Sequence, residues 1–157
     1  MSETWIILGA TSAMARAFAR DLAAAGQGLL LAGRDASELK AMAVDLEMRG
    51  ARMAEAVAFD IRDAATFAPI IERAAREDGA INTAVFVGTM PEQAEIDADP
   101  SLIDGTVMDS FTGPAQFLQR LAPIMEDRGA GVVVGVSSVA GDRGRLANYV
   151  YGSAKAG

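Results

Sequence analysis

The chain has 157 residues, of which 51% are hydrophobic and 22% charged, enough apolar material for one folded domain with its own core. Its formal net charge of −7 argues against nucleic acid or an anionic membrane as the main partner, because both attract basic surfaces. The chain has no cysteine and no histidine, which excludes disulfides and thiolate metal sites and removes the commonest metal ligand and general base. We therefore predict no metal centre and assign acid and base chemistry to Tyr, Lys, Asp or Glu.

The N-terminal segment carries no sign of export. Met1 to Trp5 lack a basic region followed by an apolar stretch, and no apolar run reaches the length of a membrane span. We therefore expect a cytoplasmic protein.

Short apolar runs alternate with longer alanine-rich segments along the chain. The apolar runs predict buried strands at 5–8, 28–32, 53–59, 84–87 and 132–136. The alanine-rich segments predict helices at 13–25, 37–48, 64–77 and 101–127, the last interrupted near Gly113-Pro114. The stretch from Pro91 to Pro100 is interpreted as an acidic connector without regular structure. This alternation predicts an α/β fold with a doubly wound parallel sheet in three layers, in a single domain over residues 1–157, with ligands at the carboxyl ends of the strands.

The first predicted strand ends in Gly9-Ala10-Thr11-Ser12 and runs directly into a helix. Free amides at the start of a helix suit the pyrophosphate of a dinucleotide, and the hydroxyls of Thr11 and Ser12 add donors. Thr11 or Ser12 is equally well explained as an ordinary helix N-cap.

Two charged residues follow the second and third predicted strands. Arg34 is placed to bind a 2′-phosphate, which favours NADP(H) over NAD(H), or is a solvated surface arginine. Asp60 either accepts a hydrogen bond from the adenine amino group or caps the helix that begins near Ala64, and capping is at least as good an explanation.

The most informative residues are Ser138, Tyr151 and Lys155. Positions i and i+4 share a helix face, so the ammonium of Lys155 is expected beside the phenol of Tyr151, where a cation favours the phenolate. Such a phenol is a general acid or base, and Ser138 is placed to hold the substrate oxygen. Tyr149 competes with Tyr151, but only Tyr151 is followed by a lysine one turn later, so Tyr149 is expected to pack or line the site.

The chain has eight methionines. We interpret those at positions such as Met14, Met42 and Met48 as residues that fill gaps in the core.

The order of these motifs over the whole chain resembles that of the short-chain dehydrogenase/reductase family: the Gly9 loop, Gly33-Arg34, Asp60-Ile61, Gly88, Ser138, Tyr151 and Lys155. The resemblance implies a Rossmann-type sheet and hydride transfer between a nicotinamide cofactor and a small carbonyl or alcohol substrate. Tyr151 would donate or accept the proton, Ser138 would orient the substrate oxygen and Lys155 would bind the nicotinamide ribose. Ser110 falls where the family has an asparagine that supports the proton relay.

The same resemblance implies a cofactor site. An arginine after the second strand marks NADP-preferring members, so NADPH is expected ahead of NAD. The residues implied are Gly9, Thr11, Ser12, Met14, Arg34, Asp60, Ile61, Gly88 and Lys155.

The chain departs from the family pattern in several places. Ala13 and Ala15 replace two loop glycines, and Val85-Phe86-Val87 replaces Asn-Asn-Ala before Gly88. The sequence stops two residues after Lys155, whereas family members continue through further strands and a substrate lid. We therefore expect a sheet that is incomplete at its C-terminal end, a fragment of a longer single-domain enzyme, and a homo-oligomer that covers the exposed apolar surface.

Two other functions fit the same fold. Ala13, Ala15 and Ser110 favour a non-catalytic nucleotide-binding or scaffold protein, and a Tyr-Lys pair also serves epimerisation or dehydration of a nucleotide sugar in longer relatives. The sequence specifies neither the substrate nor the direction of the reaction, and it leaves the oligomeric state open.

Overall fold

Five parallel strands form one sheet in the computed structural model, which describes residues 3–157. The strands are β1 (Thr4–Leu8), β2 (Gly28–Gly33), β3 (Met53–Ala58), β4 (Ile81–Val85) and β5 (Val133–Gly135). Their order is β3-β2-β1-β4-β5, and every neighbouring pair is parallel. The predicted doubly wound sheet is confirmed, with the reversal of strand order between β1 and β4.

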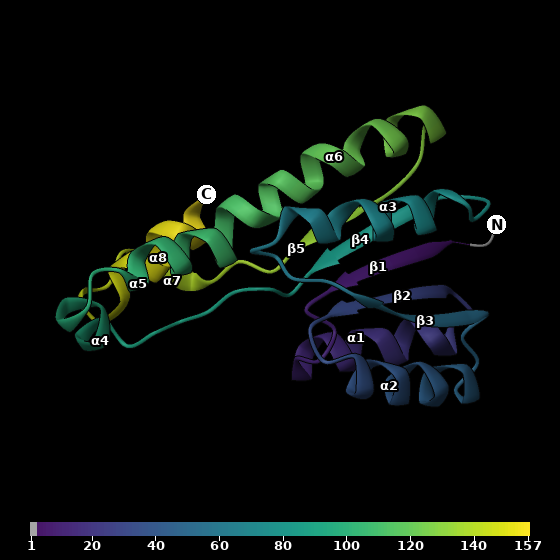
Figure 1. The fold of residues 1–157 in the computed structure, drawn as a ribbon, viewed down its shortest axis with the longest axis horizontal. Coiled ribbons are helices and arrows are strands. Elements are labelled where there is room, and N and C mark those ends of the chain that lie inside the picture. The colour runs from purple at the N-terminus through teal and green to yellow at the C-terminus, as the bar shows by residue number, and fades with distance from the viewer. Residues whose placement is uncertain (1–2) are drawn as a thin grey trace.

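Helices cover both faces of the sheet (Figure 1). One layer is made by α1 (Ala13–Ala24) and α2 (Ala36–Met48), and the other by α3 (Phe67–Ala75) and α6 (Gly113–Arg128). All five residues of β1 are buried, because its side chains enter the two layers alternately. Ile6 and Leu8 belong to the core on the α3 and α6 side, whereas Trp5 and Ile7 belong to the core on the α1 and α2 side.

A cluster of three phenylalanines fills the core between β3, α3 and α6. Phe67 and Phe117 are fully buried, and Phe59 is 3% exposed. The ring of Phe117 meets those of Phe59 and Phe67 edge-on, with centroids 5.6 Å apart in each pair. Edge-on aromatic pairs of this kind stabilise a core beyond the area they bury.

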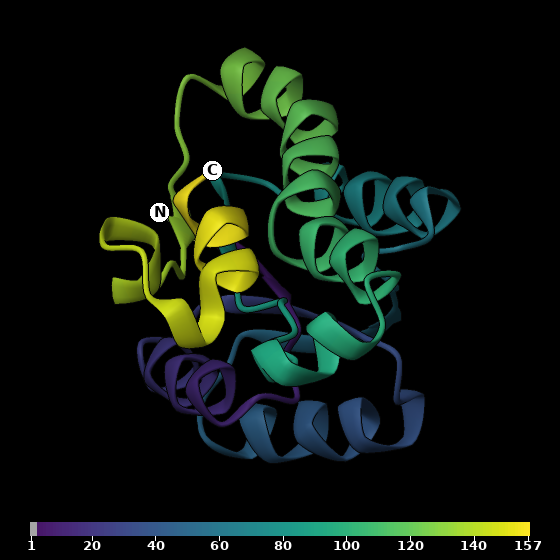
Figure 2. The same ribbon diagram turned by 90° about the vertical axis from the view of Figure 1, so that its left-hand side faces the viewer.

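Four short helices lie beyond the carboxyl ends of the strands (Figures 1 and 2). They are α4 (Gln93–Ala98), α5 (Leu102–Val107), α7 (Val139–Asp142) and α8 (Tyr149–Ala156). This end of the sheet is the one where a doubly wound fold binds ligands. Among residues 3–157, no helix is both long and apolar enough to cross a membrane.

Of two predictions for the region after β4, one was wrong and one is confirmed. Pro91–Pro100 contains the helix α4, whose first turn is closed by a capping box in which Glu92 is the N-cap and Glu95 bonds back to its amide. The predicted interruption of the long helical stretch near Gly113-Pro114 is confirmed. A π-helical turn, Met108–Thr112, joins α5 to α6, and Pro114 is accommodated because the first turn of a helix needs no amide donor there.

Other boundaries differ by a few residues. β4 begins at Ile81, three residues before the predicted start, because the polar side chains of Asn82 and Thr83 are buried with hydrogen-bond partners. The segment 64–77 starts as a 3-10 turn, Ala64–Thr66, and α3 ends at Ala75. Met42 is buried, as predicted, but Met14 is 60% and Met48 84% exposed, so the prediction of core positions was wrong for these two.

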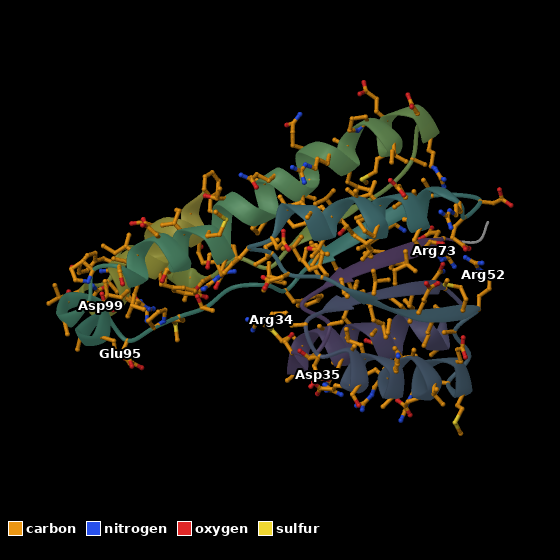
Figure 3. The ribbon with its side chains drawn as sticks, in the orientation of Figure 1. Arg34, Asp35, Arg52, Arg73, Glu95 and Asp99 are labelled. Atoms are coloured by element: carbon orange, nitrogen blue, oxygen red, sulfur yellow. The ribbon has the colours of Figure 1, made fainter. Side chains whose placement is uncertain are left out.

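The opposite end of the sheet carries a cluster of ion pairs formed by Arg52, Glu55, Arg73 and Glu77 (Figure 3 labels the two arginines). Arg73 Nε lies 2.7 Å from a Glu55 carboxylate oxygen, and Glu77 is shared between Arg73 at 2.7 Å and Arg52 at 3.0 Å. The hydrogen bond from Arg73 is the main cause that lowers the pKa of Glu77, and the hydrogen bond from Arg52 lowers it further. These charges lie at the end of the sheet away from the candidate site described next.

Candidate active site

A cavity of about 250 Å³ opens at the carboxyl ends of β1, β2, β3 and β4. Much of the cofactor site predicted from the sequence lines it: Gly9, Thr11, Ser12, Arg34, Asp60, Ile61 and Gly88. The prediction missed Gly33, Phe59, Arg62, Phe86, Val87, Thr89 and Asp109, which also line it. Met14, Ser110, Ser138, Tyr151 and Lys155 do not line this cavity.

The loop after β1 approaches the end of β4 closely. Gly9 has a φ of +75°, and a methyl group at its Cα would lie 3.2 Å from the backbone of Phe86 and Val87. Both the positive φ and this close approach favour glycine at this position. The Ser12 side chain accepts a hydrogen bond from the Ala15 amide at 3.2 Å, so the N-cap interpretation is confirmed for Ser12. Ala15, which replaces a family glycine, is fully buried in the core cluster on the α1 side.

Arg34 follows β2 at the cavity, and Figure 3 shows it at the carboxyl end of the sheet. It is exposed, and within residues 3–157 it has no ion pair. The next residue, Asp35, caps α2 by accepting a hydrogen bond from the Glu38 amide at 2.9 Å. The capping carboxylate beside Arg34 is thus engaged with the backbone and leaves the guanidinium open to the cavity.

Asp60 does not cap the helix that follows it, so that interpretation was wrong. The cap is Asp63, whose carboxylate accepts from the Ala65 amide at 3.0 Å. One oxygen of Asp60 accepts from the Arg62 amide at 2.9 Å while the residue lines the cavity. Its interaction with adenine stays a prediction.

Three of the predicted catalytic residues, Ser138, Tyr151 and Lys155, belong to two helices that pack against each other beyond β5. Ser138 is the N-cap of α7 and accepts from the Ala140 amide at 3.2 Å. A methyl group on Gly152 of α8 would lie only 2.5 Å from the Ala140 carbonyl oxygen, so the two helices touch through this glycine. Ser137 donates a hydrogen bond to the Lys155 carbonyl at 2.8 Å and fixes the last turn of α8 to the end of β5.

Lys155 joins its own helix α8 to the segments that follow β5 and β4. Its Nζ donates to the Val136 carbonyl at 2.9 Å and lies 3.5 Å from the Val87 carbonyl. The same Nζ lies over the Tyr151 ring, 6.0 Å from the centroid, so the structure places the phenol and the ammonium side by side on α8. Burial lowers the pKa of Lys155.

Gly88 and Ser110 complete the surroundings of this ammonium. A methyl group on Gly88 would lie 3.2 Å from Lys155 Nζ and 3.3 Å from Ser110 Oγ, so both atoms face this glycine. Ser110 Oγ is buried and has no hydrogen-bond partner within the described residues. A buried hydroxyl without a partner is costly, which makes it available to a water or a ligand.

Tyr149 lies apart from this group. Its side chain is 47% exposed, and its hydroxyl is 3.3 Å from an Asp97 carboxylate oxygen on α4. The negative charge of Asp97 raises the pKa of Tyr149. Tyr149 thus packs against α4 instead of lining the cavity.

Comparison with known proteins shows the family of the chain. Residues 3–157 match the family described as short chain dehydrogenase. The chain belongs to that family. The chain is 39% identical over 153 residues to the uncharacterized oxidoreductase Rv2073c of Mycobacterium tuberculosis, and the match covers 97% of the present chain.

Solved structures show the same fold. A short-chain alcohol dehydrogenase structure from Sinorhizobium meliloti matches 100% of the chain at 26% identity with a TM-score of 0.88. A short-chain dehydrogenase from Sphingobium yanoikuyae, in complex with NADPH, matches 99% at 26% identity with a TM-score of 0.85. The chain spans 61% of the length of Rv2073c and 63% and 61% of these two structures.

Proposed function

We propose that this chain carries the cofactor-binding and catalytic parts of an NADP(H)-dependent oxidoreductase that acts on a carbonyl or alcohol, with Tyr151 as the general acid or base. The observation that supports it most directly is the position of Lys155. Its ammonium lies over the Tyr151 ring and faces Gly88, at the end of the strands that line the cavity. A fixed cation beside a phenol is the arrangement that proton transfer from tyrosine needs.

The residues that line the cavity fit a dinucleotide. Gly9 and Gly88 leave space where a side chain would press on the backbone or on Lys155. The start of α1 has free amides that suit a pyrophosphate. The exposed guanidinium of Arg34 can form two parallel hydrogen bonds with a ribose 2′-phosphate. The NADPH bound to the Sphingobium yanoikuyae relative supports NADPH as the cofactor.

In the direction of reduction, a bound nicotinamide would supply the hydride to the carbonyl carbon. Tyr151 donates its phenolic proton to the carbonyl oxygen, which becomes the alcohol hydroxyl. Ser138 donates a hydrogen bond to that oxygen, and the Lys155 ammonium stabilises the phenolate left on Tyr151. The buried Ser110 hydroxyl is placed to hold a water that returns a proton. Oxidation of an alcohol reverses these transfers.

The test is to mix the protein with NADPH and a panel of aldehydes and ketones and to follow the loss of NADPH absorbance. Stoichiometric alcohol formation is expected. Tight NADPH binding with no turnover of any carbonyl or alcohol would favour the scaffold function instead. A cofactor that stays bound and is regenerated in each turnover would favour epimerisation or dehydration of a nucleotide sugar.

Replacing Arg34 by Ala is expected to weaken NADPH much more than NADH, by about 1.5–3 kcal/mol, because only NADPH carries the 2′-phosphate that the guanidinium would bind. Titration of both dinucleotides measures the difference. Arg76→Ala is the matched control, since Arg76 is an exposed arginine at the end of α3, at the opposite end of the sheet. Equal weakening of both dinucleotides by Arg34→Ala would refute the phosphate role.

We also propose that the protein acts in the cytoplasm as a homo-oligomer. Val132 and Val133, at the outer strand β5, are 52% and 49% exposed, and Val139 on α7 is 67% exposed. Exposed apolar side chains at the outer strand and on the helix that follows it support a surface that is covered in the assembled protein.

A further inference from the structure

Arg62 is held in one orientation by a buried carboxylate. Its Nε and Nη2 atoms lie 2.6 and 2.7 Å from the two carboxylate oxygens of Asp109, a bidentate pair. Asp109 is only 4% exposed and belongs to the π-helical turn between α5 and α6. Such turns are frequent at functional sites.

Two further contacts restrict this pair. Thr89, in the loop after β4, donates a hydrogen bond to Asp109 Oδ2 at 2.9 Å. A methyl group on Gly105 of α5 would lie 3.1 Å from Arg62 Nη2, so the guanidinium rests against that glycine. The loops after β3 and β4 and the π-helical turn are therefore joined through one carboxylate, and the plane of the guanidinium is fixed.

The two members of the pair differ in exposure. The Asp109 side chain is 6% exposed, whereas that of Arg62 is 51% exposed, and both residues line the cavity with Asp60 and Arg34. Buried ion pairs often add little net stability, so stability alone is a weak reason for placing a charge pair here. A flat, oriented cation on the wall of a cavity is suited to the face or edge of an aromatic ring.

We propose that Arg62 binds the adenine base of the cofactor, and that Asp109 and Thr89 are positioning residues that hold its guanidinium against the cavity. This inference rests on the proposed function, because it assumes that the cavity takes a dinucleotide. It assigns separate roles to the two arginines of the cavity. Arg34 distinguishes NADPH from NADH, whereas Arg62 strengthens both by contacting the base that they share.

The test is equilibrium binding of NADPH, NADH, 2′,5′-ADP and nicotinamide mononucleotide to the protein and its variants. Arg62→Ala is expected to weaken NADPH, NADH and 2′,5′-ADP alike, by about tenfold, and to leave nicotinamide mononucleotide unchanged, because that probe lacks adenine. Arg62→Lys keeps the positive charge but loses the planar guanidinium. We therefore expect a smaller loss of affinity for the adenine-containing probes, again with unchanged binding of nicotinamide mononucleotide. Asp109→Asn and Thr89→Val, which release the guanidinium, are expected to produce the same pattern.

Arg73→Ala is the matched control, since it removes ion pairs at the opposite end of the sheet and should lower the unfolding temperature without changing any binding constant. Unchanged binding of the adenine-containing probes by Arg62→Ala and Arg62→Lys would overturn the inference and leave a purely structural ion pair. Equal losses for nicotinamide mononucleotide and 2′,5′-ADP would also overturn it, as general damage to the cavity. A parent protein that binds none of the dinucleotides would refute the proposed function, and the inference with it.

Discussion

Tyr151→Phe is expected to lower kcat by about 10²–10⁴-fold with NADPH and a carbonyl substrate both saturating, because the phenylalanine has no proton to transfer. The dissociation constant for NADPH and the unfolding temperature should stay unchanged, since the ring still packs beside Lys155. Single-turnover and steady-state rates, with a direct NADPH titration, measure these quantities.

The matched control is Tyr149→Phe, two residues away on the same helix. Tyr149 contacts Asp97 on α4 and is 47% exposed, so removal of its hydroxyl is expected to change kcat by no more than a few-fold. If Tyr149→Phe abolished turnover and Tyr151→Phe did not, the assignment of Tyr151 as the general acid or base would be wrong.

Phe117→Ala is expected to lower the free energy of unfolding by about 3–5 kcal/mol, the usual cost of removing a large aromatic side chain from a core. Phe117 is fully buried and contacts the rings of Phe59 and Phe67 at centroid distances of 5.6 Å, so the cavity left behind has two aromatic walls that cannot collapse easily. Urea unfolding followed by circular dichroism measures the loss.

The control for this substitution is Met48→Ala, at an 84% exposed position near the end of α2. It should change the free energy of unfolding by less than about 0.5 kcal/mol. If Phe117→Ala cost no more than Met48→Ala, the aromatic cluster would not be the rigid core that the structure shows.

The order of strands and helices could be predicted from the sequence because each buried strand is a short apolar run, and β1, with every residue buried, is the clearest. The prediction failed where polar residues are buried or where caps are unusual. Asn82 and Thr83 look like loop residues until their hydrogen-bond partners are known, and these include Glu3 and the Ile6 carbonyl, almost 80 residues away. The helix α4 is capped by Glu92, an uncommon N-cap, in an acidic segment between two prolines.

The site was predictable where its chemistry follows a fixed spacing. Tyr151 and Lys155 are one helical turn apart, and Gly9 and Arg34 directly follow strands, so these positions could be read from the chain. Arg62 and Asp109 are 47 residues apart, and no spacing rule connects them. The sequence offered one sign of the missed part of the site. It is the charged residue Asp109, which stands next to the candidate residue Ser110 in a stretch predicted to be helical.

Lys155 is part of the scaffold as well as of the candidate site. Its ammonium reaches the main-chain oxygens of Val136 and Val87, just past the ends of two neighbouring strands. A free lysine side chain has about 2 kcal/mol of rotamer entropy to lose when it is ordered, and here the fold orders it in advance. An arriving ligand therefore meets a positive charge that is already in place, and the site needs little reorganisation when charge develops on the phenol.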